Sequence, residues 1–93
     1  MENLFIGAII TIPNIAQEPH LVLSTIERDE KKYALLTEVD GDVDLKTLKI
    51  NKVTFDITKS FVVSYNKNTN EILYDPNEEI INEFIHKIEN GDK

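Results

Sequence analysis

The chain of 93 residues contains no cysteine, which excludes a disulfide framework, thiolate metal ligands and a thiol nucleophile. It contains only two histidines, His20 and His86, so we do not expect a zinc site. It contains a single arginine, Arg28, and its formal net charge is −7. Phosphate contacts need clustered lysine and arginine, so this balance argues against a general nucleic-acid-binding protein. We therefore predict a small acidic protein without a metal or another cofactor.

A long hydrophobic run and a basic leader are also missing. The apolar run over residues 4–12 is too short to span a bilayer, and residues 1–3 lack the basic start of a secretory signal. We expect a cytoplasmic protein that does not bind a membrane. The length predicts a single domain over residues 1–93 with a modest core.

The first half of the chain predicts a strand followed by a hairpin. Residues 4–12 are interpreted as a strand with a bulge or a close backbone approach at Gly7, ended by Pro13. A loop over 14–18 would lead into a hairpin over 19–39, whose polar turn lies at 28–32. Both strands of this hairpin carry apolar residues on both faces. We therefore expect central strands, covered by more sheet on one side and by a helix or a partner on the other.

The second half predicts a further hairpin. Residues 40–44 are interpreted as an acidic turn, and 45–50 stay ambiguous between a helical turn and a short edge strand. Alternation over 53–57 predicts a half-exposed strand. Strands at 61–65 and 71–74 are then joined by a polar, asparagine-rich loop over 66–70.

The last segment predicts an amphipathic helix over residues 76–88. Asp75 would be the N-cap, Pro76 the first helical residue and Glu78 the partner in a capping box. We also expect Glu83 to pair with Lys87, Gly91 to end the helix and His86 to be solvated. The apolar stripe of this helix comprises Ile80, Ile81, Phe84, Ile85 and Ile88. Five or six strands and one helix together predict a mainly β fold: a small SH3-like antiparallel β-barrel with one C-terminal amphipathic α-helix.

Alternating aspartates at 40, 42 and 44 invite a calcium interpretation. A calcium-binding EF-hand loop needs glycine at its sixth position and glutamate at its twelfth, where this chain has Leu45 and Asn51. We therefore interpret the segment as an exposed acidic turn.

The order of these elements resembles the PemK/MazF family of toxin endoribonucleases. Residues 7–10 resemble the opening Gly-Asp-Ile-Val strand of that family, and 19–24 resemble its Arg-Pro-x-Val-Val-Ser strand. Residues 33–37 resemble the next strand, which ends in threonine, and 57–62 resemble a later Leu-Pro-Lys-x-Ser-x-Val segment. The resemblance implies an SH3-like barrel and a ribonuclease toxin of a toxin–antitoxin system.

The chain departs from this family where the chemistry would lie. Glu18 stands where the family has a catalytic arginine, and Glu38 and Val39 stand where a serine and a lysine would follow Thr37. RNA cleavage needs a proton acceptor and a cation for the developing charge, whereas these carboxylates repel phosphate. Thr37 and Ser24 remain as candidate catalytic hydroxyls, and both are interpreted as structural.

Three functions follow from this pattern, of which the third is a subunit or scaffold of a larger complex. The first is a non-catalytic binding protein that regulates or inhibits a macromolecular partner with a basic surface, such as a nucleic-acid-binding protein or a nuclease. Its alternative is an active PemK/MazF-like endoribonuclease, with a basic groove completed in a homodimer. The acidity itself has a simpler explanation, because charge keeps a small protein soluble. The partner-binding candidates form what we call the acidic rim: Glu27, Asp29, Glu30, Glu38, Asp40, Asp42 and Asp44.

Overall fold

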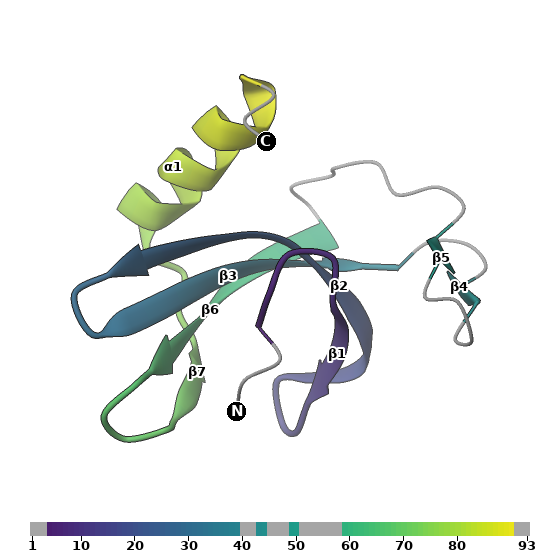
Figure 1. The fold of residues 1–93 in the computed structure, drawn as a ribbon, viewed down its shortest axis with the longest axis horizontal. Coiled ribbons are helices and arrows are strands. Elements are labelled where there is room, and N and C mark those ends of the chain that lie inside the picture. The colour runs from purple at the N-terminus through teal and green to yellow at the C-terminus, as the bar shows by residue number, and fades with distance from the viewer. Residues whose placement is uncertain (1–3, 40–42, 45–48, 51–58, 91–93) are drawn as a thin grey trace.

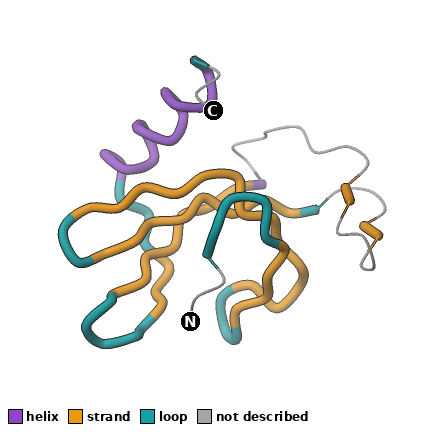
Figure 2. The backbone as a smooth tube through the Cα atoms, in the orientation of Figure 1, coloured by secondary structure: helices purple, strands orange, loops and turns teal. Residues whose placement is uncertain are grey.

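A computed structural model describes residues 4–39, 43–44, 49–50 and 59–90, which form a curled antiparallel sheet and one helix (Figure 1). The elements are β1 (Ile9–Ile12), β2 (Ala16–Arg28), β3 (Lys31–Glu38), β4 (Val43–Asp44), β5 (Lys49–Ile50), β6 (Ser60–Asn66), β7 (Ile72–Tyr74) and α1 (Glu78–Glu89). Five strands are hydrogen-bonded in the order β1-β2-β3-β6-β7, and β4 pairs with β5. The five-stranded sheet curls into a half-barrel with α1 on its outside (Figure 2). This confirms the predicted mainly β, barrel-like class with a C-terminal helix.

The β2–β3 hairpin forms the middle of the sheet, as predicted. Its register runs from Arg28 opposite Lys31 to His20 opposite Glu38. The turn is tighter than expected, because only residues 29 and 30 lie between the strands. Asp29 takes a φ of 54°, which aspartate tolerates better than most residues do. The register shifts between Val22 and Ser24, which marks a bulge in β2.

Apolar side chains are buried on both faces of the central strands, as the sequence predicts. The concave face holds one cluster, to which β1 and the N-terminal segment also contribute: Leu4, Ala8, Ile10, Ile12, Ala16, Val22, Ala34, Leu36 and Val63. The convex face holds the cluster under α1: Ile26, Tyr33, Leu35, Val62, Ile80 and Phe84. Each Å² of apolar surface that folding buries contributes roughly 25 cal/mol to the free energy of unfolding. We therefore expect these two clusters to be the main source of stability.

The predicted first strand is wrong at its start. Only Ile9–Ile12 form β1, while residues 5–7 form a turn in which Gly7 has a φ of +91°. Leu4 is nonetheless buried in the concave cluster. Pro13 ends the strand as predicted, but β2 already begins at Ala16, so residues 16–18 belong to a strand and not to a loop.

The helix begins and ends close to the predicted bounds, with a different cap. Asn77 is the N-cap, and its Oδ1 accepts hydrogen bonds from the backbone N–H groups of Glu79 and Ile80. The prediction that Asp75 caps the helix and that Pro76 is its first residue is therefore wrong. The predicted stripe holds for Ile80 and Phe84, which are buried, and for residues 81 and 88, which pack at the edge of the cluster.

The ion pair predicted within the helix is also wrong. Glu83 contacts Arg28, and Lys87 instead donates a hydrogen bond to the backbone carbonyl of Thr25 at 3.2 Å. Both contacts connect α1 to β2, because the helix packs across that strand. His86 is exposed, as expected.

The second predicted hairpin is present as β6 and β7, joined by a loop in which Asn70 has a φ of 60°. Residues 43–44 and 49–50 are paired strands, which favours the edge-strand interpretation at 49–50 and corrects the predicted turn at Asp44. The strand predicted over 53–57 and the aspartates at 40 and 42 lie outside the described residues.

Candidate functional site

The two candidate catalytic hydroxyls lie inside the sheet. Thr37 is 1% exposed and Ser24 is 6% exposed. The Thr37 hydroxyl donates a long hydrogen bond of 3.5 Å to the backbone carbonyl of the next residue, Glu38. Thr37 stands between β2 and β6, opposite Leu21 on one side and Ser60 on the other. Both hydroxyls are therefore covered by the fold in this structure.

His20, whose imidazole could act as a base, lies on the other face of the sheet from Thr37. His20 is opposite Glu38 in the register, and side chains alternate between faces, so His20 points to the concave face and Thr37 to the convex face. The Nδ1 atom of His20 lies 2.8 Å from the backbone carbonyl oxygen of Glu18, and its ring packs edge-on against Phe61 at 5.3 Å. These contacts fix the orientation of the His20 ring.

The described residues of the acidic rim in the β2–β3 hairpin are divided between its two ends. Glu27, Asp29 and Glu30 lie at its turn, and Glu38 lies at the far end of β3. The turn end of the hairpin is marked by the pair Arg28 and Lys31, and the far end by the pair His20 and Glu38. These pairs are seven residue steps apart along β3, which corresponds to roughly 24 Å of extended strand. Among the described residues, the carboxylates of the turn and Glu38 therefore lie at opposite ends of the hairpin.

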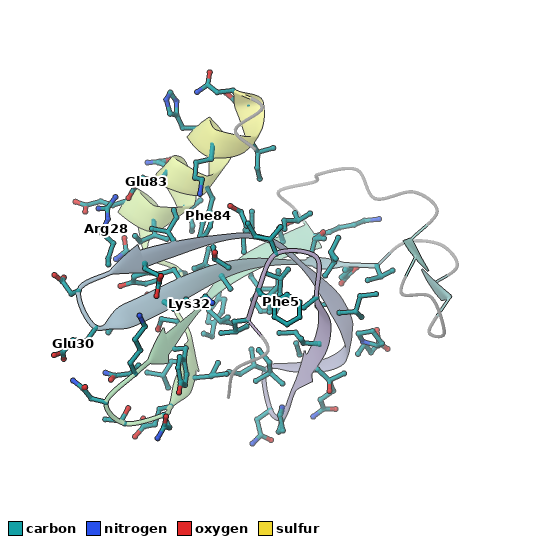
Figure 3. All side chains as sticks on the ribbon, in the orientation of Figure 1. Phe5, Arg28, Glu30, Lys32, Glu83 and Phe84 are labelled. Atoms are coloured by element: carbon teal, nitrogen blue, oxygen red, sulfur yellow. The ribbon has the colours of Figure 1, made fainter. Side chains whose placement is uncertain are left out.

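At the turn, carboxylates and cations are interleaved. Glu27 pairs with Lys67, and Glu30 accepts a hydrogen bond from the side-chain amide of Asn68. The hydrogen bond from Lys67 and its charge lower the pKa of the Glu27 carboxyl below its ordinary value. Arg28 contacts Glu83 of α1, and Figure 3 shows Arg28, Glu30, Lys32 and Glu83 together around this end of the hairpin. A hollow of about 470 Å³ at the turn is lined by Arg28, Asp29, Glu30, Lys31, Tyr33 and Asn66, so its charges have both signs.

The far end is acidic along the sequence. From Glu38 to Asp44 the chain carries four carboxylates and no lysine or arginine. Glu38 is exposed, and so is Glu18, near the start of the neighbouring strand β2. Along the sequence, Glu38 is followed by the aspartates at 40, 42 and 44. We call residues 38–44 the acidic segment.

The sequence did not reveal a hollow at the opening of the half-barrel. It has a volume of about 380 Å³ and is lined by Asn14, Ile15, Phe61 and Tyr74. Phe61 lies between two aromatic neighbours, because its ring also meets Tyr74 at 6.0 Å. The curl of the sheet brings the β1–β2 turn close to β7, and no local pattern records that approach. In the sequence, the aromatic residue Tyr74 at the end of the predicted strand was the feature that could have indicated this hollow.

The described residues contain no group of three or more acidic or histidine side chains placed to hold a metal ion. None of the described helices has the length and apolarity needed to cross a membrane.

Comparisons of the chain with protein-family models, with curated protein sequences and with solved structures found no match. The resemblance to the PemK/MazF family therefore remains a prediction from the sequence.

Proposed function

We propose that this protein is a small acidic, non-catalytic binding protein that regulates or inhibits a macromolecular partner with a basic surface. One contrast in burial supports this proposal. The hydroxyls that a ribonuclease would use, at Thr37 and Ser24, are buried, whereas Glu27, Asp29, Glu30 and Glu38 are exposed. Groups that must reach another macromolecule need exposure.

Within the rim, the acidic segment is the better candidate for the contact. At the hairpin turn, Glu27 already has a partner in Lys67 and is also near the charge of Lys32. Glu30 has a partner in Asn68. An approaching cation would gain little there, because the local charges nearly cancel. The acidic segment carries four carboxylates without a basic residue among them, which leaves it a net field to steer a basic partner.

Two triple variants with the same change in charge test the proposal. Asp40→Asn, Asp42→Asn and Asp44→Asn neutralise the acidic segment, and Glu27→Gln, Asp29→Asn and Glu30→Gln neutralise the turn. Each triple variant removes three charges, from −7 to −4. The wild type and both variants are immobilised and used to capture proteins from a bacterial lysate, and the retained proteins are identified and quantified. Association of the purified partner is then measured at increasing salt.

The proposal expects a basic partner whose capture and association rate fall in the Asp40/Asp42/Asp44 variant and stay near wild type in the turn variant. Association with the wild type should slow as salt rises, because exposed charges are screened over about 8–10 Å near physiological ionic strength. Equal losses in both variants would indicate a dependence on net charge alone. A partner retained equally by all three proteins would contradict the acidic segment as the contact.

The alternative function, a PemK/MazF-like ribonuclease, is supported by the agreement between the implied fold and the curled half-barrel with its C-terminal helix. It would need Thr37 or Ser24 to become accessible and a cation from elsewhere, since Glu18 and Glu38 are exposed and would repel phosphate.

A further inference from the structure

β7 is an edge of the five-stranded sheet, and its outward backbone groups can be assigned. The Asp75 N–H donates to the carbonyl of Val62, and the Asn66 N–H donates to the carbonyl of Glu71, each at 2.9 Å. Antiparallel pairs alternate between hydrogen-bonded and non-hydrogen-bonded, so Leu73 faces Ser64 with its backbone groups turned inwards. The N–H and C=O groups of Ile72 and Tyr74 therefore point away from β6. No strand among the described residues pairs with that side.

The side chains of this edge are unusually exposed for apolar residues. Leu73 is 55% exposed and Tyr74 is 58% exposed. Tyr74 lies opposite Val63, on the concave face, and it lines the hollow together with Phe61 and Ile15. A strand added beside β7 would place one side chain next to Tyr74 on that same face. The hollow of about 380 Å³ is then where an apolar or aromatic side chain of the added strand would be buried.

The negative charge around β7 favours a basic segment over a second copy of this chain as the binding partner. Residues 68–86 contain five carboxylates and no lysine or arginine, and Glu71 and Asp75 directly flank β7. If a second copy paired with this edge so that Ile72 stood opposite its Tyr74, Glu71 would stand opposite the other copy's Asp75 at both ends. Like charges directly opposite each other destabilise a strand pair. A segment with lysine or arginine at these positions would instead gain from both.

We propose that β7 binds an extended segment of a partner protein as an added antiparallel strand. Apolar residues of the segment alternate with lysine or arginine, and one apolar side chain enters the hollow beside Tyr74 and Phe61. Hydrogen bonds to the outward groups of Ile72 and Tyr74 hold the segment in register. This inference rests on the proposed binding function and names how a basic partner attaches.

Synthetic peptides of about six residues, a usual strand length, test the inference on the purified protein. The probe alternates lysine with valine and carries one central phenylalanine. One control replaces each lysine by glutamate, and another carries N-methyl groups on alternate backbone nitrogens, which removes the donors of one edge. Affinity is measured by fluorescence anisotropy, and exchange of the Ile72 and Tyr74 amides by NMR.

The expected result is saturable binding of the lysine peptide, with amide exchange at Ile72 and Tyr74 slowed about tenfold or more. Both control peptides should bind at least about tenfold more weakly, because each loses a charge or hydrogen-bond contribution. Glu71→Lys with Asp75→Lys should weaken the lysine peptide by a similar factor. The matched reversal Glu27→Lys with Asp29→Lys, at the hairpin turn, should leave its affinity within about twofold.

Several results would overturn the inference: no binding at millimolar peptide, equal binding of the N-methylated peptide, or slowed exchange elsewhere but not at Ile72 and Tyr74. Amides protected without peptide in a protein of dimeric mass would identify a second copy as the occupant. None of these results bears on the acidic segment. If the peptide fails while partner capture still depends on Asp40, Asp42 and Asp44, the edge inference falls and the proposed function stands.

Discussion

The guanidinium of Arg28 contacts the carboxylate of Glu83, which connects the last residue of β2 to the middle of α1 (Figure 3). The two residues are 55 positions apart in the chain. Their side chains are 54% and 38% exposed, so the pair lies at the rim of the helix–sheet contact and not within it. The ion pair connects α1 to the sheet at one position. The stability of the helix comes from the apolar side chains packed between α1 and the sheet.

We expect this pair to contribute about 0.2–1 kcal/mol to the free energy of unfolding, as exposed ion pairs do. A double-mutant cycle with Arg28→Gln and Glu83→Gln, measured by urea denaturation, should give a coupling energy in this range that shrinks in high salt. The same cycle with Glu83→Gln and Lys87→Gln is the control, since Lys87 contacts the backbone carbonyl of Thr25 instead. Equal coupling in both cycles would contradict the observed pairing.

Phe84 anchors the helix on the sheet. Its side chain is fully buried in the convex cluster, and it points from α1 towards the strands (Figure 3). Phe84→Ala should lower the free energy of unfolding by roughly 3–5 kcal/mol, a large share of a small domain's stability. Thermal melting checks this, with Ile85→Ala as a control of lower cost because Ile85 is only half-buried. A melting temperature within a degree or two of wild type would show that the helix does not depend on this contact.

The sequence predicted the central hairpin and the two-sided burial because both follow from one pattern. Successive side chains of a strand point to opposite faces of the sheet, and Tyr33, Ala34, Leu35 and Leu36 are all largely apolar. Both faces of β3 therefore had to be covered, and all four residues are buried. The start of β1 was not predictable in the same way. The pattern of apolar residues does not show that the chain turns at 5–7, where Phe5 and Ile6 are exposed, while Leu4 before the turn is buried.

The cap of α1 and the site show two other limits of sequence reasoning. Asp75 and Asn77 both suit an N-cap, so the residue type does not distinguish them, and the structure has Asn77 as the cap. The hollow at Tyr74 depends on the curl of the whole sheet, which places Ile15 near it. Long-range approaches of this kind leave no local signature.

Glu27 should titrate at a lower pH than an ordinary glutamate. Lys67 stabilises its charged form by a hydrogen bond and by its charge, which lowers the pKa of the carboxyl in the folded protein. The contribution to stability is therefore complete above the pKa of the unfolded chain and is lost as the pH falls through the lower folded value. NMR titration of the Glu27 side chain should show this shift, and Lys67→Gln should raise the pKa towards the ordinary value. A pKa that does not respond to Lys67→Gln would contradict the contact.

Metal removal should leave the protein unchanged. Alternating aspartates at 40, 42 and 44 lack the glycine and the glutamate of an EF-hand loop, so we expect no bound calcium. Dialysis against a chelator should not shift the melting temperature, and calcium added back should not raise it. A marked fall after chelation would mean that these aspartates hold an ion.

Thr37 separates the proposed function from its alternative. Thr37→Val keeps the shape of the side chain and removes a hydroxyl whose observed hydrogen bond is long, at 3.5 Å, so stability should change by no more than about 1 kcal/mol. A binding protein should leave purified RNA intact, and the wild type and Thr37→Val should behave alike in a gel-based cleavage assay over several hours. Both should also capture the same partner, while the Asp40/Asp42/Asp44 variant should not. If wild type cleaves RNA and Thr37→Val does not, the hydroxyl is catalytic despite its burial, and the ribonuclease becomes the better account of this fold.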